Sequence, residues 1–138
     1  MKAAMSSDNV ETARRAFTSF NEHGFGSEET LSFFDDSVVF EEPPEQPAPR
    51  IARGRDEAAQ MFTEFDDAWE THTSESQDFI AIDDERVLVL TIEHFRGRNG
   101  IEMTQPSGVV FAFRDGKIIR MQAFWEQATA REAAGLGK

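Results

Sequence analysis

The sequence predicts a single α+β domain, in which helices from the first half of the chain cover a sheet formed mainly by the second half. Apolar residues recur every three or four positions up to about residue 70 and then alternate with polar residues. Two tight-turn dipeptides, Asn99-Gly100 and Asp115-Gly116, each separate runs rich in Val, Ile and Phe, which is typical of β-hairpins. Three helices on one face of a curved antiparallel or mixed sheet would form a cone-shaped barrel with one open end.

The first helix is expected to begin at a cap on Ser7 or Asp8, after a disordered segment over residues 1–7. Its buried face is predicted from helical spacing, and Gly24 and Gly26 are expected to end it. The residues of that face are Val10, Ala13, Phe17 and Phe20.

The next elements are predicted as a short helix over residues 27–34, a strand over 37–42 and a third helix over about 55–70. Residues 42–49 contain four prolines, which exclude both a helix and a central strand, so this segment is expected to be irregular.

The second half of the chain is expected to form strands over residues 73–82 and 86–98, and then a pair joined at Asp115-Gly116. The first strand of that pair begins at residue 101, and a bulge or bend is expected at residues 105–107 because of Pro106. Residues 8–127 are thus expected to form one domain, followed by a helical tail over residues 128–138.

Composition excludes several classes of function. The chain has 138 residues, no Cys and a formal net charge of -12, which argues against nucleic-acid binding because phosphates require clustered Lys and Arg. Without Cys there is no disulfide and no thiol nucleophile, which suits a cytoplasmic protein. No run of 18 apolar residues predicts a membrane span, and residues 1–7 do not resemble a signal peptide.

Four segments, taken in order, resemble the nuclear transport factor 2-like superfamily, and within it the SnoaL-like and ketosteroid isomerase-like proteins. Residues 121–125 (MQAFW) are similar to the last strand of ketosteroid isomerases, and residues 34–43 (FDDSVVFEEP) to a segment that ends in an acid-Pro pair. Residues 53–58 (RGRDEA) resemble the start of the third helix, and residues 133–136 (AAGL) the tail of many SnoaL-like proteins. The resemblance implies an apolar pocket. A homodimer is expected because the second face of the sheet also carries apolar residues.

The resemblance also implies a candidate base, at Glu42 or, in the other possible register, at Glu41. In ketosteroid isomerases this acid moves a proton beside a carbonyl, while a Tyr and a protonated Asp hold the resulting oxyanion. Those two donors correspond to Phe17 and Val109, which have no proton to donate. Because one lost donor costs roughly 3–4 kcal/mol, the chain is not expected to be an efficient ketosteroid isomerase.

Glu42 is the better placed of the two acids, because it shares a strand face with Val38 and Phe40. Burial among aromatic side chains would raise the pKa of its carboxyl toward the range of a general base. The alternative is a surface acid at the pocket rim. His72 and His94 are two further candidate proton carriers, each with a structural role as its alternative. His23, His72 and His94 have no metal-ligand spacing, so no metal site is expected.

The pocket wall follows from strand alternation and the resemblance together. Met121, Ala123 and Trp125 share one face of the last strand, whereas Glu126 would point away. The other residues expected on the wall are Phe17, Phe40, Phe62, Val109 and Phe111. Gln105 and Ser107 are expected to reach a ligand carbonyl if the bend at Pro106 turns them inward.

Three functions therefore stay open. The first is an enzyme that needs no cofactor and isomerises, cyclises or dehydrates a polyketide- or steroid-like carbonyl compound. The second is a non-catalytic protein that binds an apolar small molecule in the same cone. The third is a structural or dimerisation domain that uses the outer face of the sheet.

Overall fold

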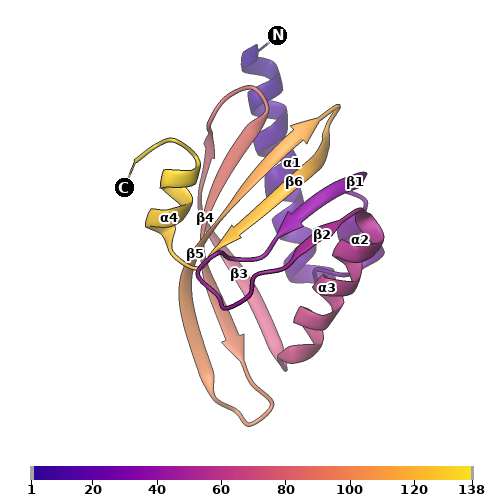
Figure 1. Cartoon of the computed structure of the whole chain (residues 1–138), viewed down its shortest axis with the longest axis vertical. Helices are drawn as coiled ribbons and strands as arrows, with labels where there is room; N and C mark the ends of the chain where they lie inside the picture. Colours follow the sequence, from indigo (N-terminus) through magenta and orange to yellow (C-terminus); the bar gives the residue numbers. More distant parts are fainter. Residues whose placement is uncertain (1, 138) are drawn as a thin grey trace.

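The computed structural model describes residues 2–137 and shows four helices and six strands in that range (Figure 1). The helices are α1 (Lys2–His23), α2 (Glu28–Leu31), α3 (Arg55–Ala68) and α4 (Gln127–Ala133). The strands are β1 (Phe34–Glu41), β2 (Ile51–Arg53), β3 (Thr71–Ala81), β4 (Arg86–Arg96), β5 (Glu102–Arg114) and β6 (Lys117–Phe124). The predicted α+β class is confirmed.

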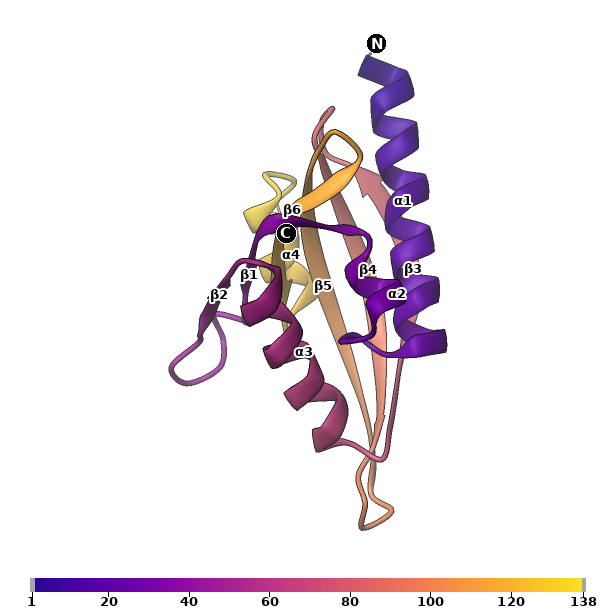
Figure 2. The same cartoon turned by 90° about the vertical axis from the view of Figure 1, so that its right-hand side faces the viewer.

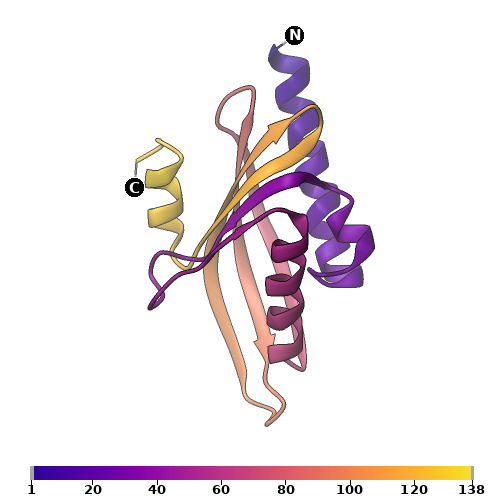
Figure 3. The same ribbon diagram turned by 45° about the vertical axis from the view of Figure 1, so that its right-hand side comes forward.

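The six strands form one curved sheet in the order β2-β1-β6-β5-β4-β3. Neighbouring strands are antiparallel except for β1 and β6, which are parallel. Helices α1 and α3 lie on the concave face, and α4 lies on the opposite side of the sheet (Figures 2 and 3). The sheet therefore forms a cone that stays open at one end.

Two apolar clusters lie on the two faces of the sheet. The larger one joins α1 and α3 to the concave face, with Phe17, Phe62 and Phe111 all nearly inaccessible to solvent. The smaller one lies under α4, where Ala130 packs with Leu88 and Val110. The C-terminal helix thus covers part of the outer face of the sheet, where a dimer contact is expected.

The helix boundaries differ from the predicted ones mainly at the N-terminus. Helix α1 begins at Lys2, so the predicted start at Ser7 or Asp8 is wrong, and residues 2–7 are helical rather than disordered. Residue 1 lies outside the described residues. Helix α2 covers only one turn, begins at the cap formed by Ser27 and ends at Leu31, because the chain is already extended at Phe34.

The Asp115-Gly116 turn is confirmed, since both residues adopt positive φ angles of 52° and 78° between β5 and β6. The predicted bulge at Pro106 is wrong, because β4 and β5 pair without a break and Pro106 lies opposite Ile92. The register shift lies between Ala112 and Phe113 instead, where β5 pairs with β6. Strand β2 has only three residues and was not predicted.

Within residues 2–137, none of the helices combines the length and the apolar character needed to cross a membrane.

Candidate functional site

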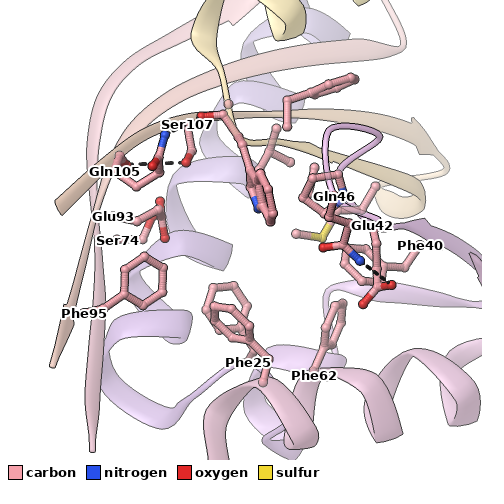
Figure 4. Close-up of a pocket in the computed structure, with 18 of the residues that line it drawn as sticks. Phe25, Phe40, Glu42, Gln46, Phe62, Ser74, Glu93, Phe95, Gln105 and Ser107 are labelled. Atoms are coloured by element: carbon pink, nitrogen blue, oxygen red, sulfur yellow. Dashed lines mark hydrogen bonds between the residues drawn. The ribbon is translucent and has the colours of Figure 1, made fainter. Parts of the chain in front are cut away.

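A cavity of about 460 Å³ lies between the concave face of the sheet and helices α1 and α3 (Figure 4). This volume suits a drug-sized ligand. Aromatic side chains from helices, strands and connecting segments dominate its wall, and these are Phe17, Phe25, Phe40, Phe62, Phe65, Trp69, Phe95, Phe124 and Trp125. The cavity is therefore suited to flat apolar molecules.

The structure places most of the predicted wall on this cavity. The residues in question are Phe17, Phe40, Phe62, Val109, Met121, Ala123 and Trp125. Phe111 is the exception, and its predicted position at the wall is wrong. It is fully buried in the core, where its ring contacts Phe17 at 5.8 Å and Phe113 at 6.0 Å between centroids.

A polar group interrupts the apolar wall where β3 and β4 pair. The Glu93 carboxylate accepts one hydrogen bond from Ser74 Oγ at 2.6 Å. A second hydrogen bond, also of 2.6 Å, joins the carboxylate to His72 Nε2. Ser74 and Glu93 lie directly opposite each other in the sheet and both line the cavity. A carboxylate held by two buried partners in an apolar cavity is a candidate for acid-base chemistry.

His72 lies behind Glu93 and does not reach the cavity wall. Its ring is stacked between Phe25 and Phe95, with centroid distances of 5.2 and 4.6 Å, and its side chain is 6% exposed. The two stacked rings hold the imidazole in place, and its hydrogen bond in turn fixes the position of the Glu93 carboxylate.

Ser74 is fixed as well, by α1. The Asn21 side chain accepts a hydrogen bond from the Ser74 backbone N–H at 2.8 Å and donates one to the Ser74 backbone carbonyl at 2.9 Å. Both partners of Glu93 are thus held in place by the surrounding structure.

Glu42 also lines the cavity, but its carboxylate is paired rather than free. Its carboxylate forms an ion pair with Arg50, with a distance of 3.0 Å from Nη2 to Oε2, and it accepts further bonds from Arg50 and Gln46. Burial raises the pKa of Glu42, but the hydrogen bonds and charge of Arg50, together with Gln46, outweigh it and leave the pKa below its ordinary value. The predicted rise toward the range of a general base is absent.

Glu41 lies on the other side of β1. Its Oε2 accepts a hydrogen bond from Arg120 Nε at 2.5 Å on β6, and it is not part of the cavity wall. Strand alternation therefore decides which of the two acids faces the cavity, and that acid is Glu42.

Gln105 and Ser107 on β5 both reach the cavity wall, although β5 has no bulge at Pro106 in its pairing with β4. Gln105 lies directly opposite Glu93 and donates to the carbonyl of Trp125 at 2.8 Å. Ser107 is 8% exposed and donates only a long bond of 3.4 Å, to the Gln105 carbonyl. Its hydroxyl is therefore available to a ligand.

Glu93 and Ser74 were not among the predicted site residues. A signal was present, because Val87, Val89, Thr91 and Glu93 alternate onto one face of β4, so a carboxylate extends an inward-facing row. His94, on the opposite face, is exposed and pairs with Glu75 at 2.9 Å. Within the described residues, no group of three His, Asp or Glu side chains could hold a metal ion.

Known structures share this architecture over nearly the whole chain. Bal32a from a soil-derived mobile gene cassette is 20% identical, with a TM-score of 0.78 and coverage of 94% of this chain and 97% of that one. TerC, co-crystallised with polyporic acid, is 18% identical, with a TM-score of 0.75 and coverage of 93% and 98%. Rv0760c from Mycobacterium tuberculosis, in complex with estradiol-17beta-hemisuccinate, is 14% identical, with a TM-score of 0.73 and coverage of 87% and 95%.

Identities this low establish the fold and leave the chemistry open. Among curated proteins, no sequence matches this chain. The family itself is identified from the sequence, because the profile of the SnoaL-like domain matches residues 13–121, which hold the Ser74–Glu93 pair and most of the cavity wall. With most of its length matched, the chain belongs to the SnoaL-like domain family.

Proposed function

We propose that this protein is an enzyme that moves a proton at a carbon next to the carbonyl of an apolar, polyketide- or steroid-like ring compound. The observation that carries the proposal is the Glu93 carboxylate, which lies at the wall of an aromatic cavity and is held by His72 and Ser74. In this proposal Glu93, rather than Glu42 or Glu41, is the base.

The proton transfer begins when the Glu93 carboxylate accepts the proton from the carbon next to the carbonyl. The electron pair of the broken C–H bond forms a carbon–carbon double bond, and the carbonyl electrons move to oxygen. Glu93 then returns the proton to a second carbon in an isomerisation or to a departing hydroxyl in a dehydration. In a cyclisation the enolate carbon attacks a second carbonyl of the substrate, whose electron pair moves to oxygen, and Glu93 returns the proton to the alkoxide that forms.

Ser107 is the group that would stabilise the oxyanion. Gln105 lies opposite Glu93 and Ser107 lies two residues further along β5 on the same face, so Ser107 is a diagonal neighbour of Glu93. Diagonal neighbours are about 7–8 Å apart, which leaves room for a reacting carbon and its carbonyl between the two side chains. With Phe17 and Val109 at the positions of the usual donors, efficient ketosteroid isomerisation is not expected.

The ligands of similar folds support a ring compound. TerC was crystallised with polyporic acid and Rv0760c with a steroid hemisuccinate, both in chains that superpose over most of this one. The nine aromatic side chains of the cavity wall offer matching surfaces to such rings.

Deuterium exchange tests the proposal without knowledge of the final product. The protein is incubated in D2O with ring ketones such as 2-tetralone and 1-indanone, and deuterium next to the carbonyl is followed by NMR. Glu93→Gln should lower the exchange rate by about 100-fold or more, since a positioned base contributes at least that factor. Glu42→Gln is the matched control and should retain exchange.

The result also separates the enzyme from the binding protein. Exchange that depends on Glu42 and not on Glu93 would return the base to its predicted position. Ketones that bind in the cavity without any exchange would support the non-catalytic alternative.

A homodimer is a further part of the proposal. The outer face of the sheet carries Ile80, Ile82 and Leu90, which are only partly buried beside α4. A second copy covering this region would remove that apolar surface from water.

A further inference from the structure

The proline-rich segment between β1 and β2 brings two polar side chains to the cavity wall, those of Glu42 and Gln46. Four prolines restrict this segment, and the Glu42 backbone N–H donates to the Arg50 carbonyl at 3.0 Å, which closes its two ends. Gln46 itself is held in a turn, because its N–H donates to the Pro43 carbonyl at 3.2 Å. The segment therefore presents Gln46 to the cavity from a fixed backbone.

The Glu42 carboxylate fixes the orientation of the Gln46 amide. Its Oε1 accepts from Gln46 Nε2 at 2.8 Å, from Arg50 N at 2.8 Å and from Arg50 Nε at 3.1 Å, while Oε2 accepts from Arg50 Nη2 at 3.0 Å. A reversed amide would set its carbonyl oxygen against this carboxylate, so the NH₂ group must face Glu42. The amide carbonyl then faces away from Glu42 and into the cavity (Figure 4).

Gln46 lies across the cavity from Glu93, Ser74, Gln105 and Ser107 (Figure 4). Apolar and aromatic side chains separate the two polar regions. The charged side chains on the described wall are Glu42 and Glu93, and no Lys or Arg is among them. A carboxylate or phosphate on the ligand would therefore meet negative charge without a cation to pair with.

We propose that Gln46 selects the substrate, by accepting a hydrogen bond from a hydroxyl at the end of the ligand that lies away from Glu93. The substrate class is then an uncharged ring compound with a carbonyl at one end and a hydroxyl at the other. Glu42 and Arg50 are positioning residues for this contact. The inference rests on the proposed function, which places the carbonyl of the ligand beside Glu93.

Three flat ketones that differ only at the far end test this proposal: 6-hydroxy-2-acetonaphthone, 6-methoxy-2-acetonaphthone and 2-acetonaphthone. Their Kd values are measured by isothermal titration calorimetry. The wild type should bind the hydroxy compound about three- to tenfold more tightly than the other two, the value of one neutral hydrogen bond. The Gln46→Leu variant should bind all three with similar Kd values.

Two further variants sharpen the experiment. Gln60→Leu is the matched control, because Gln60 is exposed on α3 and is not on the cavity wall, so this variant should keep the preference. Glu42→Gln should weaken the preference, because Gln46 then loses its charged anchor. Circular dichroism confirms that each variant is folded.

Equal Kd values for the three ketones in the wild type, or a preference that survives in Gln46→Leu, would overturn the role of Gln46 and leave the cavity as a ketone site. Failure of all three ketones to bind would instead overturn the proposed function together with this inference.

Discussion

Gly108 allows α4 to pack closely against the sheet, and adding one methyl group there should loosen that contact. Gly108 is buried on β5, and a Cβ atom at this position would lie 2.5 Å from the Ala130 Cβ. Two methyl carbons in contact are about 3.5–4.0 Å apart, so α4 would have to move outward by about 1 Å or more. That movement would separate Ala130 from Leu88 and Val110 in the smaller core.

Overpacking of this kind costs about 1–3 kcal/mol, so Gly108→Ala should lower Tm by about 3–10 °C for a chain of this length. The assay is thermal unfolding followed by circular dichroism. A double-mutant cycle isolates the contact, because Ala130→Gly removes the methyl group with which the new Cβ collides. Although Ala130→Gly alone should cost about 1 kcal/mol through helix propensity, the double variant should be more stable than additivity predicts by about 1–2 kcal/mol.

Additive effects in this cycle, or a Gly108→Ala variant as stable as the wild type, would refute the argument. Either result would mean that α4 is not packed against β5 as closely as the 2.5 Å approach requires.

Three other predictions concern the cavity and the assembly. Arg50→Met should lower the free energy of unfolding by about 1 kcal/mol at pH 7. Because the pKa of Glu42 in the folded state lies below its ordinary value of 4.5, the ion pair stabilises the fold above pH 4.5. The difference between wild type and variant in urea unfolding should therefore shrink as the pH falls below 4.5. Phe62→Ala removes a ring that is 3% exposed and packs against Phe40 at 4.8 Å, so it should cost about 3–5 kcal/mol, whereas a loss below 1 kcal/mol would show that the wall collapses easily. Light scattering should give twice the monomer mass at micromolar concentration, and a monomer mass there would contradict the proposed homodimer.

Local signals in the sequence predict most of the fold. Asp115-Gly116 specifies its hairpin because both residues tolerate positive φ, and helical spacing identifies Phe17 and Phe62 as buried. Strand β2 has too little length for a periodic signal, and its pairing with β1 depends on how the proline-rich segment closes. The predicted bulge at Pro106 is absent because proline disrupts a strand only at positions where the backbone nitrogen must donate a hydrogen bond.

The candidate site was harder to predict, because it depends on contacts between residues far apart in the sequence. The strand residues of the aromatic wall follow from the alternation of side chains along each strand. The pKa of Glu42, in contrast, depends on its ion pair with Arg50, which lies at the other end of the proline-rich segment. The partners of Glu93 likewise come from β3, so the sheet register determines that cluster. Periodicity indicates which face of a strand or helix a residue occupies, but it does not identify the side chain that the residue meets from a distant part of the sequence.

The row formed by Ser74, Glu93 and Gln105 crosses three adjacent strands at one level of the sheet. Each strand contributes a single side chain, and its backbone hydrogen bonds do not depend on which side chain that is. A substitution within the row can therefore change the chemistry at the cavity wall while the register stays the same. A slip of β4 by one residue would instead turn the Glu93 side chain to the outer face. In evolutionary terms, this row is a place where a SnoaL-like domain could acquire a new reaction by exchanging one residue at a time, without having to evolve a new fold.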